Sequence, residues 1–321
     1  MKQAKDKRTA FIWASVPIAA VFLIVAGPNR PPTSVIASAR TQAATTPQIP
    51  SDASERSDTP LEAEIPPVRL TFHTIQVANA NSLSSLKSTL GEQGIDAMLK
   101  LNRLDAKHLR KGMTLAVPDA PLPLIALSPF PQELEMAASL PKLILVSREA
   151  QAFGAYEAGK LVYWGPTSTG KKSTQTPAGL YFTNWKKKET RSTVNPAWIL
   201  PWAFNLDNLQ GIAFHQYDLP GFPASHGCVR LLNQDAQWIY GWADTWILSK
   251  KDNSVVAYGT PVIIFGDYSY GKEAPWKRLP QDPAAASVSK TIAEQALNKH
   301  LPTVEARAQA RESLLLLASV K

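Results

Sequence analysis

The pattern of hydrophobic and polar positions begins with an uncharged apolar run, residues 10–27, that follows a basic start. The run is long enough to cross a bilayer, and the preceding basic residues should stay on the cytoplasmic side. We therefore expect residues 1–27 to form a basic cytoplasmic tip and a transmembrane signal anchor. The rest of the chain would lie in the cell envelope, on the periplasmic or cell-wall side; a cleaved signal peptide is the alternative. Residues 28–67 contain eight prolines and no aromatic residue, which predicts a disordered tether.

Regular periodicity returns within residues 68–119. The stretch FHTIQV (72–77) alternates like a strand, apolar residues share helical faces within 83–90 and within 95–99, and a second alternation covers 113–118. The predicted order is strand, helix, helix, strand. With HTIQV, LSSL, LNRL and LRKGMTLAVP as landmarks, this order resembles the LysM module, a small α+β (βααβ) domain that binds cell-wall glycan. The resemblance implies glycan as a partner; a packing module without a ligand is the alternative.

Short β-rich runs broken by glycine fill residues 141–267, beyond a proline-rich linker at 120–140. The runs KLILVS, KLVYWGP, GLYFTNW and PVIIFGD predict hairpins of a mainly β, antiparallel domain. Residues 268–321 lose the strand pattern and show two helical patterns, which we interpret as a helical C-terminal tail. The leucine run at 314–317 should pack on the body of the protein, unless it belongs to a partner-binding helix.

Length and charge define the general class of the protein. A chain of 321 residues, 45% of them hydrophobic and 19% charged, has room for two or three folded domains. The net charge of +8 favours anionic partners: nucleic acid, anionic lipid or a carboxylate-rich polymer. Export, as predicted above, disfavours nucleic acid. Cys228 is the sole cysteine, so an intramolecular disulfide cannot form and the thiol is either inert or used.

Candidate chemistry gathers around this cysteine, in the stretch HQYDLPGFPASHGCVRLL (215–232). A thiol attacks a carbonyl as the thiolate, and a nearby histidine, His226 or His215, can take the proton and pair with the charge. The turn formers in between would let His215 face Cys228. The amides of Gly227 and Cys228 could bind an oxyanion, and the positive end of a helix that begins just after this stretch would support the thiolate.

Two other interpretations compete with catalysis at this stretch. Free cysteine is among the most buried residue types, so Cys228 could be part of a core. A metal site is the second possibility, although the spacing of its four candidate ligands fits no familiar zinc pattern. The ligands would be His215, Asp218, His226 and Cys228.

Two elements of the sequence resemble a known family. SHGCVR (225–230), preceded by a histidine and a Pro-Gly-aromatic-Pro-Ala run, is similar to the signature of the L,D-transpeptidases, whose catalytic domain is named YkuD. TSTGKKSTQTPAGLYF (167–182) resembles the hairpin that precedes their active site. The resemblance covers residues 141–267 and implies a mainly β, sandwich-like catalytic domain. It also implies that the cysteine is acylated by a peptidoglycan tetrapeptide stem, releases the terminal D-Ala, and passes the acyl group to an amine of another stem, with no cofactor or metal.

The resemblance assigns roles by position. Cys228 would be the nucleophile and His215 the general base, its imidazole oriented by the backbone carbonyl of Gln216, at a position where many relatives carry glycine. His226 would shape the oxyanion hole together with the amides named above. Arg230 would hold a substrate carboxylate or brace the loop. The oxyanion-hole and substrate-binding positions lie in or beside one turn: Ser225, Gly227, Arg230 and Gln216.

Several alternatives remain open at the level of sequence. Water in place of the amine would make the protein an L,D-carboxypeptidase or endopeptidase, and a protein amine as acceptor would attach that protein to the wall. A non-catalytic cell-wall-binding protein would carry Cys228 as a structural residue. A papain-like protease is disfavoured because both candidate histidines precede the cysteine. Lys186–Lys188 with Trp185, Trp198 and Trp202 form either a basic, aromatic loop over the cleft or a solvated hairpin tip beside core tryptophans.

Overall fold

The structure is a computed structural model that describes residues 70–78 and 82–319. The chain divides into two units, Met1–Glu64 and Ile65–Lys321, and only the second contains described residues. The expected anchor (1–27) and tether (28–67) therefore lie outside the described residues. Within residues 70–78 and 82–319, none of the helices combines the length and apolar character that a membrane crossing requires.

The first folded part is a two-stranded sheet covered by a helix. Strand β1 (Phe72–Gln76) pairs antiparallel with β2 (Thr114–Pro118), and α1 (Ser82–Leu101) lies between them in sequence. At Gly91 the backbone leaves the helical region (φ 70°, ψ 176°), so α1 consists of two helical segments, in the order the periodicity predicts. A 3₁₀ helix (Ala106–His108) follows. This part, residues 70–119, is called the N-terminal unit below.

The larger part is one nine-stranded sheet in the order β6-β13-β3-β4-β5-β10-β9-β8-β7. Its strands, in chain order, are β3 (Leu143–Ser147), β4 (Ala152–Glu157), β5 (Lys160–Ser168), β6 (Gly179–Phe182), β7 (Lys186–Arg191), β8 (Ile199–Asp207), β9 (Ile212–Gln216), β10 (Val229–Leu231) and β13 (Pro261–Phe265). Two short strands, β11 (Ile247–Leu248) and β12 (Val255–Ala257), form a separate ribbon. The chain is mainly β, as expected.

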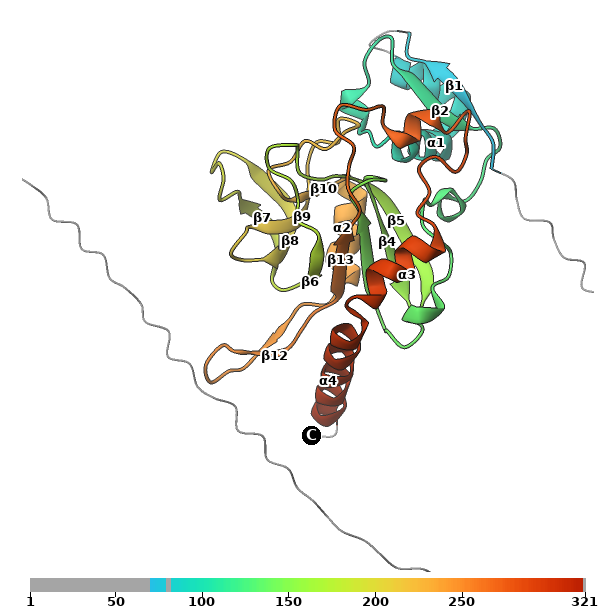
Figure 1. Ribbon diagram of the computed structural model, residues 1–321. Coiled ribbons are helices and arrows are strands. Elements are labelled where there is room, and N and C mark those ends of the chain that lie inside the picture. Colours follow the sequence, from blue (N-terminus) through green and yellow to red (C-terminus); the bar gives the residue numbers. More distant parts are fainter. Residues whose placement is uncertain (1–69, 79–81, 320–321) are drawn as a thin grey trace, which may run out of the picture. The chain divides into compact units, whose positions relative to one another are not determined.

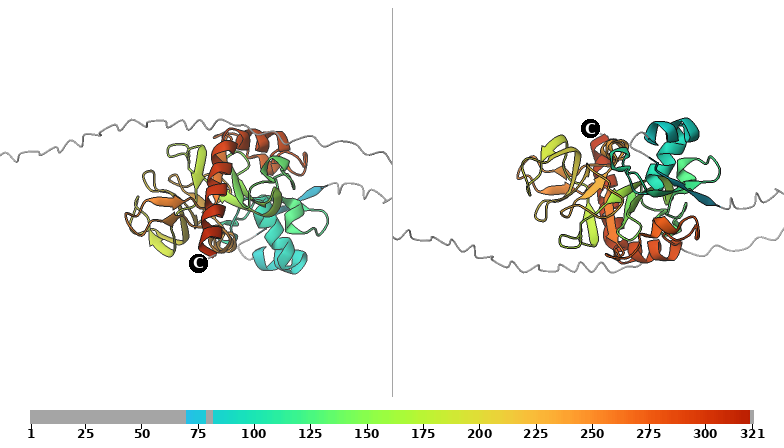
Figure 2. Two further views of the ribbon diagram at one scale, coloured as in Figure 1. Left: turned by 90° about the horizontal axis from the view of Figure 1, so that it is seen from below. Right: turned by 90° about the horizontal axis from the view of Figure 1, so that it is seen from above.

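The prediction of an antiparallel structure is wrong at two places in this sheet. Strand β13 runs parallel to β3, and β10 runs parallel to β9. The hydrophobic pattern of a strand reports which face is buried and carries no information about the direction of its neighbour. The sheet also curls on itself instead of splitting into two separate sheets, as Figure 1 and the turned views of Figure 2 show.

Both faces of the central strand β3 are buried. Leu143 and Leu145 belong to a core on one face of the sheet, while Ile144 and Val146 belong to a core on the other. Alternate residues of a strand point to opposite faces, so each face needs its own cover. Three helices contribute to these two cores: α2 (Asn233–Trp242) to the second, and α3 (Lys290–Asn298) and α4 (Leu301–Ser319) to the first.

Two segments differ from their sequence-based interpretation. The expected linker, 120–140, contains two 3₁₀ helices, Leu124–Leu127 and Glu135–Ala137, and buries Phe130 and Leu134 in the core. A further 3₁₀ helix, Pro275–Arg278, precedes α3. The leucine run near the end of α4 does not pack on the body, because three of its members are exposed: Leu315, Leu316 and Leu317. Val304, near the start of the same helix, is buried against the body of the protein.

A buried ion pair joins the N-terminal unit to the sheet. Lys100, in the last turn of α1, donates 2.7 Å to Asp235 of α2, and both side chains are almost fully buried. The Lys100 ammonium also donates to the carbonyl oxygen of Trp164 in β5 (3.2 Å). The neighbouring Arg103 is buried between Trp164 and Trp276 and donates to the Ala150 carbonyl at 2.9 Å. These contacts fix the end of α1 against the larger sheet.

Candidate active site

The candidate residues converge because β9 and β10 are parallel neighbours. In this register His215 lies opposite Arg230, and Cys228 immediately precedes β10. Since alternate positions share a face, the side chains of His215, Cys228 and Arg230 are on the same side of the strand pair. All three line one pocket, together with Ala213 from the same face. The predicted convergence of His215 and Cys228 is therefore found.

The imidazole of His215 is held in one orientation. It is 3% exposed, and its Nδ1 donates 2.9 Å to the backbone carbonyl of Gln216, the contact that the sequence predicts. Burial lowers the pKa of His215 from 6.5 to about 4; the bond to Gln216 opposes this and nearby Arg230 adds to it. The ring is therefore neutral near pH 7, with the hydrogen on Nδ1 and a free lone pair on Nε2.

The thiol of Cys228 is also kept in its neutral form. Its Sγ donates 3.2 Å to the carbonyl oxygen of Gly211. Burial raises the pKa of Cys228, against the opposing effects of a backbone hydrogen bond at Ala213 and of Arg230. The helix expected to support a thiolate, α2, begins at Asn233 as predicted, and the net shift nevertheless favours the neutral thiol. Desolvation is the largest contribution to this pKa shift and exceeds the two opposing effects.

The turn before Cys228 is closed by the hydroxyl of Ser225. This hydroxyl donates 2.6 Å to the Cys228 carbonyl and accepts from the Gly227 N–H at 3.1 Å. Gly227 has φ +119°, a conformation that side chains rarely adopt. The Gly227 N–H therefore already has an acceptor in this structure, and its role toward an oxyanion stays a prediction that requires this bond to be replaced.

The second sequence element packs directly against this turn. The Ser225 N–H donates 3.0 Å to the Thr169 carbonyl, and the Lys171 N–H donates 3.0 Å to the Ser225 carbonyl. Gly170 has no room for a Cβ, which would overlap the Thr174 carbonyl oxygen. The segment beginning at Thr167 therefore supports the cysteine turn. The expectation that this segment is a hairpin is wrong, because the strands at its two ends, β5 and β6, do not pair with each other.

His226 lies at the pocket wall, between an ammonium and an indole. Its Nε2 is 3.0 Å from Lys171 Nζ, and its ring centroid is 4.9 Å from that of Trp198. Burial lowers the pKa of His226, and the charges of Lys171 and Arg230 lower it further. Because an ammonium can only donate, Nε2 accepts and Nδ1 carries the hydrogen. Among the described residues that buried Nδ1 has no hydrogen-bond partner.

The remaining pocket wall comes from the β7–β8 hairpin. Trp198 and Arg191, near the tip of that hairpin, line the pocket. The lysines predicted for the tip lie instead along β7, where Lys186 donates to the Tyr240 carbonyl. Trp202 packs on the ring of Tyr240. Trp198 therefore fits the interpretation of a loop over the cleft, and Trp202 fits that of a tryptophan beside the core, whereas the lysines lie on a strand.

Sequence reasoning missed three residues of the site. Lys171 contacts His226; Arg191 lines the pocket; and the ring of Tyr217 lies 4.6 Å from the Arg230 guanidinium carbon. Tyr217 follows the predicted base by two positions, and this short spacing was the available signal. Lys171 lies within the second family-like element (167–182) without being named there, and nothing in the sequence singles out Arg191, whose proximity to the site depends on folding.

The four side chains proposed as metal ligands do not form a group. Asp218 instead pairs with Lys107 of the N-terminal unit. Over residues 70–78 and 82–319, three or more His, Cys, Asp or Glu side chains nowhere gather in a way that could hold a metal ion.

The site lies within a segment that a family comparison identifies. Residues 141–264 match the L,D-transpeptidase catalytic domain (YkuD). The matched segment contains His215, Ser225, His226, Cys228 and Arg230. The match supports an enzyme of the L,D-transpeptidase type. A comparison with curated proteins found no match.

Solved structures similar to the chain include several described as L,D-transpeptidases. One from Stackebrandtia nassauensis is 24% identical over 40% of this chain and 57% of its own, with a TM-score of 0.33; the chain thus spans little more than half of that protein. One from Mycobacterium smegmatis is 17% identical over 49% and 75%, with a TM-score of 0.31. One from Xylanimonas cellulosilytica is 19% identical over 60% and 98%, with a TM-score of 0.38.

Proposed function

We propose that the protein is a peptidoglycan L,D-transpeptidase that uses Cys228 as its nucleophile. The observation that carries this proposal is a single pocket that holds the Cys228 thiol, the buried neutral imidazole of His215 and the guanidinium of Arg230. These are a nucleophile, a base and a cation for a carboxylate, the groups that acyl transfer from a peptide with a free C-terminus requires.

The first half of the reaction acylates the cysteine. His215 Nε2 takes the thiol proton as Sγ attacks the carbonyl of the third stem residue, so the thiolate forms only in the presence of substrate. The tetrahedral intermediate then collapses, the C–N bond to the terminal D-Ala breaks, and His215 returns the proton to the leaving amine. The neutral resting pair suits this order of events, because a base with a free lone pair is ready at neutral pH.

The developing oxyanion needs hydrogen-bond donors other than the Gly227 amide. We assign this role to the Cys228 N–H and to the Nδ1 hydrogen of His226. The second assignment is supported by the tautomer that Lys171 imposes and by the lack of another partner for Nδ1 in the described part of the chain. A donor without another acceptor does not have to break an existing hydrogen bond when it binds the oxyanion.

The second half of the reaction resolves the thioester. An amine of a neighbouring stem attacks, gives its proton to His215, and expels the Cys228 thiolate, which recovers that proton. Water in the same place would give a carboxypeptidase or endopeptidase. We propose the amine as acceptor, in keeping with the match to the L,D-transpeptidase domain.

The cellular setting belongs to the same proposal. Peptidoglycan is a carboxylate-bearing polymer outside the cytoplasmic membrane, and a net charge of +8 favours such a partner. The N-terminal anchor would keep the domain beside the wall, and the LysM-like unit would add contact with glycan.

Intact-mass spectrometry of the full chain incubated with a disaccharide tetrapeptide tests this function. The parent should gain the substrate mass minus D-Ala and then yield a cross-linked dimer of stems, while Cys228→Ala should gain nothing. His215→Ala should acylate at least a hundredfold more slowly, and His300→Ala, outside the pocket, should behave as the parent. An adduct that yields only tripeptide would assign hydrolysis instead, and an unmodified parent would refute the proposal.

A further inference from the structure

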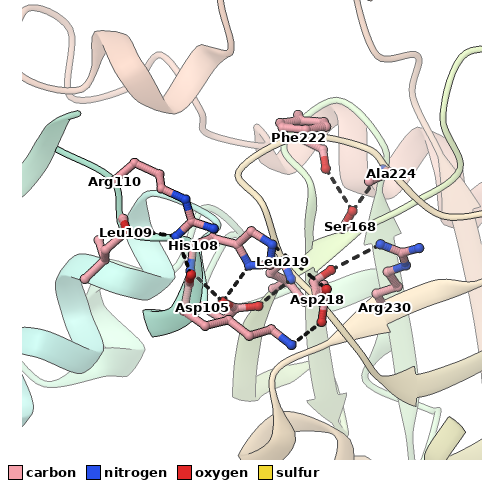
Figure 3. A network of polar contacts seen from close by, with 11 residues as sticks. Asp105, His108, Leu109, Arg110, Ser168, Asp218, Leu219, Phe222, Ala224 and Arg230 are labelled. Atoms are coloured by element: carbon pink, nitrogen blue, oxygen red, sulfur yellow. Dashed lines mark hydrogen bonds and ion pairs between the residues drawn. The ribbon is translucent and has the colours of Figure 1, made fainter. Parts of the chain in front are cut away.

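The loop that joins the proposed base to the proposed nucleophile is held by the N-terminal unit. Asp105, which follows α1, accepts from the Leu219 N–H through Oδ2 at 2.8 Å. Its own N–H donates 3.0 Å to the Leu219 carbonyl. The other carboxylate oxygen accepts from the His108 N–H (3.1 Å) and is 2.7 Å from His108 Nδ1. Figure 3 shows Asp105 between His108 and Leu219.

Charged and apolar contacts extend this junction along the loop. Lys107 forms an ion pair with Asp218. Leu104 forms an isolated antiparallel bridge with Pro220, and its side chain lies where a Cβ on Gly221 would be 3.1 Å away. Thus every residue from 218 to 221 touches the N-terminal unit. We call residues 217–222 the bridging loop.

The other end of the loop is held by the larger sheet. The hydroxyl of Ser168, in β5, donates 2.8 Å to the Phe222 carbonyl and accepts from the Ala224 N–H at 3.0 Å. At the end nearest His215, the Tyr217 N–H donates 3.2 Å to the Leu231 carbonyl of β10. Both ends are therefore held by the catalytic domain, whereas the middle, residues 218–220, is held by the N-terminal unit, where Asp105 binds both backbone groups of Leu219.

Tyr217 of the bridging loop lines the pocket beside Arg230, the proposed carboxylate-binding group. Arg230 donates to the Asp218 carbonyl at 3.5 Å, and its guanidinium carbon lies 4.6 Å from the centre of the Tyr217 ring. That ring also meets the His215 imidazole edge-on, with centroids 5.8 Å apart. Tyr217 and Arg230 both line the pocket. Displacing the loop would therefore move the neighbours of both the base and the guanidinium.

We infer that Asp105 is a positioning residue for the active site, acting through the bridging loop on Arg230 and Tyr217. This inference rests on the function proposed above, and adds that the N-terminal unit is a structural part of the catalytic site. The argument is local: the Asp105 carboxylate supplies the acceptor for the Leu219 amide, and its loss leaves that part-buried amide unsatisfied. Small misplacements of positioning groups reduce rates strongly.

The test compares variants of the full chain. Asp105→Ala removes the acceptor for the loop, and Asp105→Asn keeps an amide oxygen there. Asp119→Ala is the matched control, because Asp119 is a carboxylate of the same unit that pairs with His73. We expect Asp105→Ala to lower kcat/KM for the tetrapeptide about tenfold, Asp105→Asn to restore most of it, and Asp119→Ala to change it less than twofold.

A double variant separates positioning from general loss of stability. If Asp105 acts through Arg230, the effect of Asp105→Ala should shrink to less than twofold in an Arg230→Ala background. A tenfold loss in both backgrounds, or no loss in either, would overturn the inference.

A readout that needs no substrate distinguishes this inference from the proposed function. Alkylation of Cys228 by iodoacetamide should become severalfold faster in Asp105→Ala and not in Asp119→Ala, because displacing the loop moves Tyr217 out of the pocket wall. If the parent fails to acylate but alkylation responds in this way, the function is wrong and the positioning role stands. If the parent acylates and alkylation is unchanged, the function stands and Asp105 is only a structural contact.

Discussion

The buried neutral imidazole of His215 predicts a specific loss of stability in acid. In the unfolded chain His215 binds a proton with its ordinary pKa of 6.5, whereas in the native protein burial lowers that pKa to about 4. Between these two values the unfolded state binds a proton that the native state does not, so the free energy of unfolding falls as the pH falls. Above pH 6.5 both states are neutral at this position and His215 contributes no pH dependence.

The size of the effect follows from the two pKa values. At about 1.4 kcal/mol for each pKa unit, the full penalty below pH 4 is about 3 kcal/mol, and about 2 kcal/mol of it has accrued by pH 5. This is a large share of the total stability of a typical domain, about 5–15 kcal/mol. The loss in the free energy of unfolding should therefore be measurable at a pH where the protein is still folded.

Urea unfolding of the full chain at pH 7.5 and pH 5.0, followed by tryptophan fluorescence, measures this loss. His215→Asn removes the titrating group and keeps an N–H donor for the Gln216 carbonyl. The parent should lose about 2 kcal/mol more than this variant between the two pH values, and a His300→Asn control should match the parent. Equal losses in the parent and in His215→Asn would refute a buried neutral base.

Two other substitutions test contacts that hold the site together. Asp235→Ala leaves the Lys100 ammonium buried without its carboxylate and should lower the free energy of unfolding by about 3–5 kcal/mol. Lys100→Met combined with Asp235→Leu should lower it by less than either single change. A loss below about 1 kcal/mol from Asp235→Ala would contradict an ion pair that is shielded from water. Ser225→Ala removes the hydroxyl that closes the cysteine turn and should lower the free energy of unfolding by about 1–3 kcal/mol. It should also slow the acylation of Cys228, followed by intact mass over time. An unchanged time course would mean that the turn keeps its shape without the hydroxyl.

The candidate residues could be singled out from the sequence because most of them are neighbours in the chain. Ser225, His226, Gly227 and Cys228 are consecutive, so no long-range folding is needed to bring them together. His215 could be added because a turn of suitable composition separates it from the cysteine. The alternation of buried residues likewise predicts strands, since it depends only on which face of a sheet is covered.

What the sequence could not predict depends on contacts between distant segments. Asp105 lies 114 positions from Leu219, whose N–H donates a hydrogen bond to it. In the sequence Asp105 looks like an ordinary N-cap of the short helix that follows it. The direction of the Cys228 pKa shift could not be predicted for a related reason: it depends on how far folding removes the thiol from water, and desolvation exceeds the opposing effects of the hydrogen bond at Ala213 and of Arg230.

The parallel pairing of β3 with β13 has a consequence for the way the chain folds. In this register Val262 pairs with Ile144, so two adjacent interior strands of the sheet come from opposite ends of the catalytic domain. Until residues 261–265 are synthesised, β3 keeps one unpaired edge of five buried-type residues, an arrangement that invites pairing with other chains. Folding should accordingly be slow and dominated by long-range contacts, and a chain truncated before β13 should aggregate even though it contains every residue of the proposed active site.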